Sequence, residues 1–159
     1  MNIEILCVGK LKESYLQDAV TEYKKRLSKY CRFNILEVAD EKTIDKQSEA
    51  QDEIVRDREG ERLIRLLREQ AYVITLEING KMMDSVEFAK TMEELAVRSV
   101  SDIQFVIGGS LGLSKAVMNR ADLALSFSKM TFPHQLMRVI LLEQIYRGYR
   151  IINHEPYHK

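Results

Sequence analysis

The sequence predicts an α/β protein with a mostly parallel sheet and helices on both of its faces. Short apolar runs, typical of buried strands, alternate with segments that repeat apolar residues every three or four positions, as amphipathic helices do. A chain of 159 residues, 45% of them hydrophobic, is long enough to bury one substantial core. Glycine- or serine-rich turns follow two of the late strand-like runs, which is where α/β proteins bind small ligands.

Five strands and five helices are expected in alternation. The strand patterns cover 3–8, 33–38, 72–78, 103–107 and 123–127. The helix patterns cover 16–30, the second half of the highly charged stretch 40–70, then 85–96, 114–121 and 134–149. No repeat or linker divides the chain, so we expect a single domain over 1–159.

Local signals mark several boundaries. Asn79 and Gly80 predict a turn after the third strand. Ser85 and Ser114 are expected to cap the helices that follow them. Pro133 suits the first turn of the last helix, where its missing N–H costs nothing.

Composition excludes several classes of protein. A formal net charge of zero argues against a domain that coats nucleic acid by charge alone. The two cysteines, Cys7 and Cys31, do not make a disulfide framework, and a buried free thiol is expected at Cys7. No run resembles a signal peptide or a membrane span, so we expect a cytoplasmic protein. The three histidines show no zinc-ligand spacing, and no metal is expected.

Charge is distributed unevenly along the chain. Residues 10–32 hold seven Lys or Arg against three acids, and residues 37–61 hold ten acids against four bases. The basic segment is either a surface for a polyanion or an ordinary solvated helix face.

The stretch FVIGGSLGL, residues 105–113, fails both common phosphate-binding patterns. Ser110 stands where the dinucleotide fingerprint needs glycine, and Leu113 replaces the second glycine of the nucleotide-phosphate loop. Gly108 instead leaves room for backbone to approach a ligand without a Cβ in the way. Small and apolar neighbours would form a slot suited to a flat uncharged group such as a purine. Plain tight turns are the alternative.

The last helix lacks a wholly polar face. Its four consecutive apolar residues, 139–142, spread around most of the helix. Such a helix is buried on several sides, and a second subunit would provide that burial most easily. This pattern predicts a homodimer through residues 134–149.

Several of these segments resemble one known family. The runs FVIGGSLGL and LSFSKMTFPHQLMRVILLEQIYRGYRI and the ending EPYHK are similar to the RlmH family, the pseudouridine N3-methyltransferases of bacterial large-subunit rRNA. The segments VGKLKESY and VITLEINGK fit as well, so the resemblance covers essentially the whole chain.

The resemblance implies a SPOUT-type α/β fold with a C-terminal trefoil knot, whose cofactor-binding part falls within about 72–150. It also implies S-adenosyl-L-methionine as methyl donor, a homodimer, and rRNA of the assembled ribosome as substrate. The family's cofactor contacts correspond here to Leu76, Gly108, Phe127, Ser128, Lys129, Met130, Thr131 and Phe132.

Three residues are candidates for catalysis. The target imide nitrogen must lose a proton, so a base or an anion-stabilising cation would help. His134 begins the last helix beside the cofactor turn, and Arg138 lies one turn further on. His158, with Tyr157, could close over the base from the tail. The alternatives are a histidine that contacts backbone, an interface salt bridge at Arg138, and a disordered chain end.

RNA contact is expected from Lys10, Lys12, Arg138, Arg147, Arg150 and Lys159. Because the net charge is zero, affinity for naked RNA should be weak, and a folded ribosome should supply more of the contact. Glu143 is expected to pair with Arg147 rather than act as a base. The alternatives are a SPOUT enzyme for another RNA, such as tRNA, and a non-catalytic ribosome-binding module.

Overall fold

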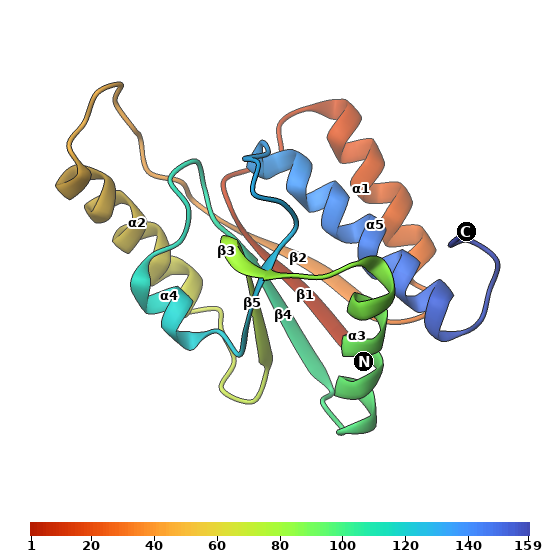
Figure 1. The fold of residues 1–159 in the computed structure, drawn as a ribbon. Coiled ribbons are helices and arrows are strands. Elements are labelled where there is room, and N and C mark those ends of the chain that lie inside the picture. The colour runs from red at the N-terminus through yellow and green to blue at the C-terminus, as the bar shows by residue number, and fades with distance from the viewer.

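A computed structural model describes residues 1–159, in which five strands and five helices alternate from end to end (Figure 1). The strands are β1 (Asn2–Val8), β2 (Arg32–Val38), β3 (Tyr72–Met82), β4 (Asp102–Ile107) and β5 (Leu123–Ser126). The helices are α1 (Ser14–Leu27), α2 (Glu49–Ile64), α3 (Ser85–Val97), α4 (Lys115–Arg120) and α5 (His134–Ile152). This confirms the predicted α/β class.

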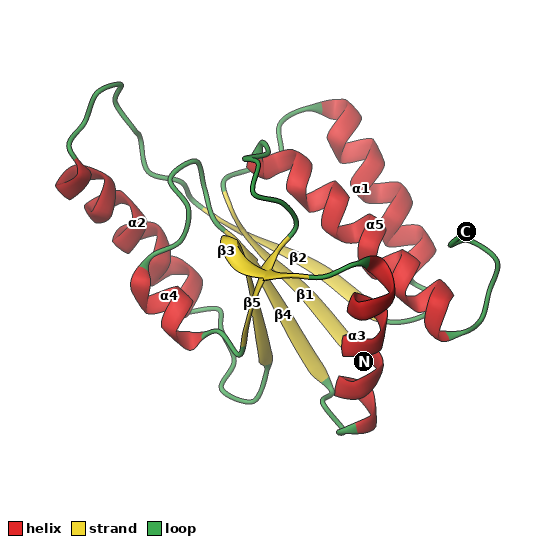
Figure 2. Ribbon diagram, in the orientation of Figure 1, coloured by secondary structure: helices red, strands yellow, loops and turns green.

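All five strands run parallel, in the order β2-β1-β4-β3-β5 (Figure 2). Helices α1, α3 and α5 cover one face, and α2 and α4 cover the other (Figure 1). Strand β1 shows why both faces are apolar: Ile3, Ile5 and Cys7 join the larger core, whereas Leu6 and Val8 join the smaller one. A strand buried on both sides reads as a continuous apolar run, which is the pattern found in the sequence.

Strand β3 is longer than the sequence predicts. The expected turn at Asn79 and Gly80 is wrong, because the strand continues to Met82 and pairs with β5 a second time. A Cβ at Gly80 would lie 2.8 Å from the backbone of Ala124. The glycine therefore serves this close crossing and not a hairpin turn. Passage of the chain through its own loop, as a trefoil knot requires, stays a prediction from the family resemblance.

Helix starts follow the local sequence closely. Ser114 caps α4 as predicted, accepting a hydrogen bond from the Val117 amide at 3.3 Å. For α3 the cap is Asp84 and not Ser85, because Asp84 forms a reciprocal capping box with Glu87. Pro133 immediately precedes the first residue of α5.

Helix α5 obtains its burial within the chain. It packs against α1 and α3, and Leu141, Leu142 and Ile145 are fully buried there. The apolar breadth of this helix therefore does not by itself require a second subunit, which removes the argument that predicted a dimer. None of the five helices combines the length and apolarity needed to cross a bilayer. Both cysteines are free, and Cys7 is buried as expected.

Candidate functional site

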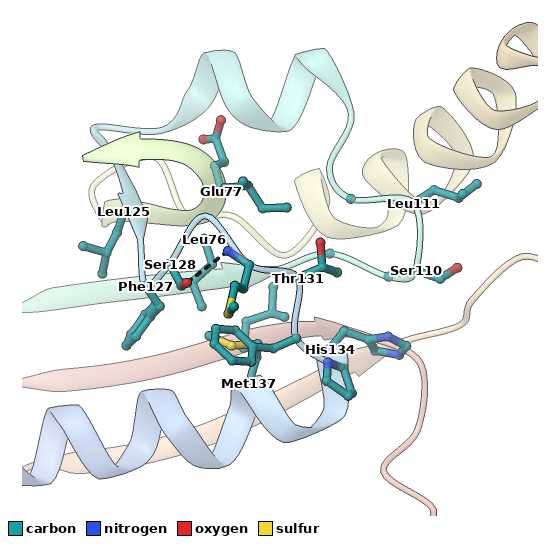
Figure 3. Close-up of a pocket in the computed structure, with 18 residues that line it drawn as sticks. Leu76, Glu77, Ser110, Leu111, Leu125, Phe127, Ser128, Thr131, His134 and Met137 are labelled. Carbon is teal, nitrogen blue, oxygen red and sulfur yellow. Dashed lines mark hydrogen bonds between the residues drawn. The ribbon is translucent and has the colours of Figure 1, made fainter. Parts of the chain in front are cut away.

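A cavity of about 650 Å³ opens beyond the carboxyl ends of β3, β4 and β5. Three segments far apart in sequence meet there, together with the start of α5 (Figure 3). Its lining consists of residues 76–78, 107–112, 125, 127–128, 130–134 and 137. This is the edge of a parallel sheet at which α/β proteins place ligands.

The turn after β4 is built around glycine. A Cβ at Gly108 would lie 2.7 Å from the carbonyl carbon of Gly112, so the fold of the turn itself requires glycine. Gly112 has φ of +83° and donates its amide to the Gly109 carbonyl at 3.1 Å. The tight-turn interpretation therefore accounts for Gly108, which also lies in the cavity wall.

Two serines hold the turn after β5. The Ser126 hydroxyl donates to the Ile78 carbonyl at 2.9 Å and so ties this turn to β3. The Ser128 hydroxyl accepts from the Met130 amide at 3.0 Å, shown as the dashed line in Figure 3. With its backbone fixed in this way, the segment presents Phe127 and Phe132 to the cavity.

Seven of the eight residues expected to contact a cofactor lie in the wall of this one cavity: Leu76, Gly108, Phe127, Ser128, Met130, Thr131 and Phe132. The eighth, Lys129, is exposed and does not line it. Sequence reasoning did not assign Glu77, Ile78 or Met137 to the site. Of these, Ile78 belongs to the apolar run that predicted the third strand.

His134 lies in the cavity wall at the first position of α5. Burial, with the positive charge of Arg138, lowers the pKa of its imidazole below 6.5, although Asp40 acts in the opposite direction. The ring is therefore neutral at pH 7 and keeps one nitrogen lone pair for accepting a hydrogen bond.

Arg138 does not reach the cavity. Its side chain is 1% exposed, Nη1 donates to Glu37 Oε2 at 2.8 Å, and Nη2 donates to the carbonyl oxygens of Val8 at 3.1 Å and Gly9 at 2.6 Å. These acceptors within the chain hold both terminal nitrogens, so the structure gives Arg138 a structural role, and direct contact with a substrate stays a prediction. The predicted interface salt bridge is likewise an ion pair within one chain.

His158 lies in the tail beyond α5, next to Arg147 of that helix, and does not line the cavity. Its Nδ1 is 3.3 Å from Nη1 of Arg147, and the neighbouring Tyr157 hydroxyl donates to Glu143 at 3.2 Å. Arg147 also pairs with Glu143 at 2.7 Å, as predicted. Within one chain the tail therefore packs against the helix and does not close over His134.

The cations expected to contact RNA divide into two groups. Arg138, Arg147 and Arg150 are each engaged by a carboxylate of the same chain. Lys10 and Lys12 are exposed on the loop after β1 and form no ion pair. Lys159, at the end of the tail, is likewise exposed and forms no ion pair, so these three lysines are the ones free to meet phosphate.

Comparison with known proteins identifies similar chains. The family model described as "Predicted SPOUT methyltransferase" matches residues 1–158. The chain is 59% identical to the ribosomal RNA large subunit methyltransferase H of Clostridium novyi and 55% identical to that of Clostridium kluyveri, over the full length of each. Among solved structures, a probable methylase family protein from Haemophilus influenzae shares the fold, with a TM-score of 0.55 and 13% identity over 99% of this chain and 70% of that one.

Proposed function

We propose, since the chain belongs to the RlmH family of SPOUT methyltransferases, that it transfers a methyl group from S-adenosyl-L-methionine to N3 of a pseudouridine in 23S rRNA. The substrate in this proposal is the assembled ribosome, which places the enzyme in the cytoplasm. The observation that carries the proposal is the single cavity that collects seven of the eight expected cofactor residues from three separate turns.

The cavity fits the proposed methyl donor in size and chemistry. A volume of about 650 Å³ is within the range of pockets that enclose drug-sized ligands. Leu76, Ile107 and Phe127 offer apolar faces to an adenine ring, while the backbone of the turns at 108–112 and 127–132 offers N–H and C=O groups. Lys129 would contact the cofactor only through its backbone, because its side chain lies outside the cavity.

The bound cofactor would supply a sulfonium methyl already activated for attack by a nucleophile. The chain then has to orient the target base and exclude water. His134 provides a neutral imidazole at the cavity wall, where it can accept a hydrogen bond from the base or from a ribose hydroxyl. Arg138 acts indirectly, because it fixes the start of α5 and therefore the position of His134.

A homodimer is part of the proposal and rests on the surface around the cavity. Several large apolar side chains there are exposed to water, among them Ile78 at 49%, Met130 at 73% and Leu136 at 37%. Exposed apolar groups gathered in this way are typical of an interface. A second copy would cover them and bring a tail with His158 toward the first copy's cavity, which the chain's own tail does not approach.

Two alternatives predict different results in the same assays. Transfer of labelled methyl groups to whole ribosomes, but not to bulk tRNA, is expected, and the reverse result would favour a SPOUT enzyme for tRNA. A non-catalytic ribosome-binding module need not hold the cofactor. Calorimetry that detects no binding of S-adenosyl-L-methionine, together with no methyl transfer to ribosomes, would therefore overturn the proposal.

A further inference from the structure

A second, polar pocket, which no hydrophobic residue lines, adjoins the cavity. It has a volume of about 260 Å³ and is lined by Asp40, Glu41, Lys42, Thr43, Glu59, Gly109, Ser110 and His134. Three of these residues, Gly109, Ser110 and His134, also line the larger cavity. Ser110 and His134 lie toward the same end of that cavity (Figure 3), so the polar pocket joins it there.

Glu59 is the buried functional group of this pocket. Its side chain belongs to α2 and is 4% exposed, and its Oε2 accepts a hydrogen bond from the Glu41 amide at 3.0 Å. Its Oε1 accepts no hydrogen bond and forms no ion pair within the chain. Oε1 is not among the buried polar atoms that lack a partner, so it keeps contact with solvent in the pocket, where it can receive a donor from a ligand.

The surrounding backbone fixes the direction of this carboxyl group. The loop after β2 is tied to α2, because Arg62 donates to the Ala39 carbonyl at 2.8 Å and pairs with Glu41. On the opposite side, a Cβ at Gly109 would lie 3.2 Å from Glu59 Oε1, so a larger residue there would push this oxygen aside by a few tenths of an ångström. The free oxygen is therefore held beside the wall that the two pockets share.

The charges around Glu59 favour a ligand that donates hydrogen bonds. Burial, together with the charges of Asp40 and Glu41, raises the pKa of Glu59, whereas Arg62 and the Glu41 amide act in the opposite direction. Arg58 is 3.8 Å from Glu41, and the imidazole of His134 is neutral, which leaves Lys42 as the one unpaired cation of the lining. A phosphate would be repelled here, and the carboxylates do not converge as metal ligands do.

We propose that this polar pocket receives the imide edge of the target base and that Glu59 Oε1 accepts the proton of N3. The inference rests on the proposed function and adds the residue that removes the proton. A uracil-type edge presents one N–H between two carbonyl oxygens. Glu59 supplies the acceptor, while the Ser110 hydroxyl and the Lys42 ammonium supply donors for the flanking oxygens.

The proposed step balances. The N3–H bond breaks as its proton moves to Glu59 Oε1, and the nitrogen electron pair forms the new N–CH₃ bond. The electron pair of the methyl–sulfur bond stays on sulfur, so the sulfonium becomes a neutral thioether. A carboxylate whose pKa is raised by burial is a stronger base than an exposed one, which suits this role.

The pH profile of Glu59→Gln tests the inference. Single-turnover methyl transfer to ribosomes should fall about 100-fold or more at neutral pH, the usual contribution of a general base. The deficit should shrink as the pH approaches the ionisation of the imide itself, because the base is then no longer needed. S-adenosylhomocysteine should bind with unchanged affinity in calorimetry. The matched control is Glu61→Gln, an exposed carboxyl on the same helix, which should behave like the wild type.

Each contrary result has a distinct meaning. If the wild type methylates ribosomes and Glu59→Gln does so equally fast, or with a deficit that does not depend on pH, Glu59 is not the base. If Glu59→Gln no longer binds S-adenosylhomocysteine, the pocket is part of the cofactor site and the inference is overturned. If the wild type itself transfers no methyl group to ribosomes, the proposed function fails first.

A second variant covers the case in which Glu59→Gln does not fold. Ser110 is exposed on a loop, so Ser110→Ala should leave the fold intact. This variant should raise the ribosome concentration needed for half-maximal rate several-fold. Its affinity for S-adenosylhomocysteine should equal that of the wild type. An unchanged ribosome dependence would contradict the placement of the base in this pocket.

Discussion

Arg138 donates a hydrogen bond from Nη1 to Oε2 of Glu37 over 2.8 Å and so joins the first turns of α5 to the carboxyl end of β2. Because Nη2 also donates to the carbonyl oxygens of Val8 and Gly9, one buried guanidinium fixes α5 against two strands. The same turns of α5 carry His134 and Met137 into the cavity wall. The ion pair is therefore a structural support of the site.

Replacing Arg138 with Met should destabilise the protein. The change removes the donor of two carbonyl oxygens and leaves Glu37 with only the Leu11 amide, and removing one partner of a buried pair costs about 3 kcal/mol when the other partner is partly exposed. Urea unfolding measures this loss. The matched control is Arg147→Met on the same helix, which removes a guanidinium that is more exposed than that of Arg138 and should cost under about 1 kcal/mol. A fully stable Arg138→Met that has lost methyl transfer would restore a direct catalytic role for the guanidinium.

Phe127→Ala should weaken binding of S-adenosylhomocysteine. The ring lies in the cavity wall, and losing the burial of an aromatic side chain corresponds to roughly a 10-fold to 100-fold rise in Kd. Isothermal titration calorimetry measures the affinity, and circular dichroism confirms that the variant is folded. Lys129→Ala, two residues away and outside the cavity, should bind like the wild type. Equal affinities for the two variants would place the ligand elsewhere.

His134 should make the protein less stable in mild acid. Its pKa is lowered in the folded state, so below the unfolded value of 6.5 the unfolded chain binds more protons than the folded one. The free energy of unfolding should therefore fall as the pH decreases from 7 to 5. Glu59, whose pKa is raised, acts in the opposite direction over its own range.

The matched variant for this effect is His134→Gln, which keeps a polar side chain but does not titrate. Chemical denaturation at pH 7 and pH 5 should show a smaller difference for the variant than for the wild type. An identical difference in both proteins would mean that His134 is not responsible for the acid sensitivity.

The elements were predictable because their signals are local. All five strands could be recognised from short apolar runs, which are clearest in β1 and β4, where the strands are buried on both faces. Gly80 shows the limit of this reasoning: beside Asn79 it reads as a turn, but the glycine is needed where β3 crosses β5, a contact between residues 44 positions apart. Sequence spacing carries no information about such a crossing.

The site was predictable in its apolar wall and not in its charged groups. Turns that follow strands fall at one sheet edge by topology, so the residues expected to contact a cofactor could be grouped in advance. Arg138 near His134 suggested a ligand, yet tertiary packing directs it to Glu37. Glu59 was hidden in a stretch of ten acids, where nothing local distinguishes the one carboxyl that a folded loop buries.

A charge introduced on α3 should disrupt the proposed dimer at one end of this helix and not at the other. Val86 is 51% exposed at the start of this helix, four residues beyond Met82, where β3 passes β5 beside the cavity. Val97 is 79% exposed at the opposite end. Val86→Asp should place an unpaired charge in the interface and shift sedimentation from a dimer to a monomer at micromolar concentration, because burying such a charge is costly. Val97→Asp makes the same chemical change away from the cavity and should sediment like the wild type.

The monomer made by Val86→Asp should lose methyl transfer, because the second copy is proposed to bring His158 to the site. Relative to the wild type, its affinity for S-adenosylhomocysteine should fall less than its rate of methyl transfer. A wild-type protein that sediments as a monomer and still methylates ribosomes would show that one chain is sufficient.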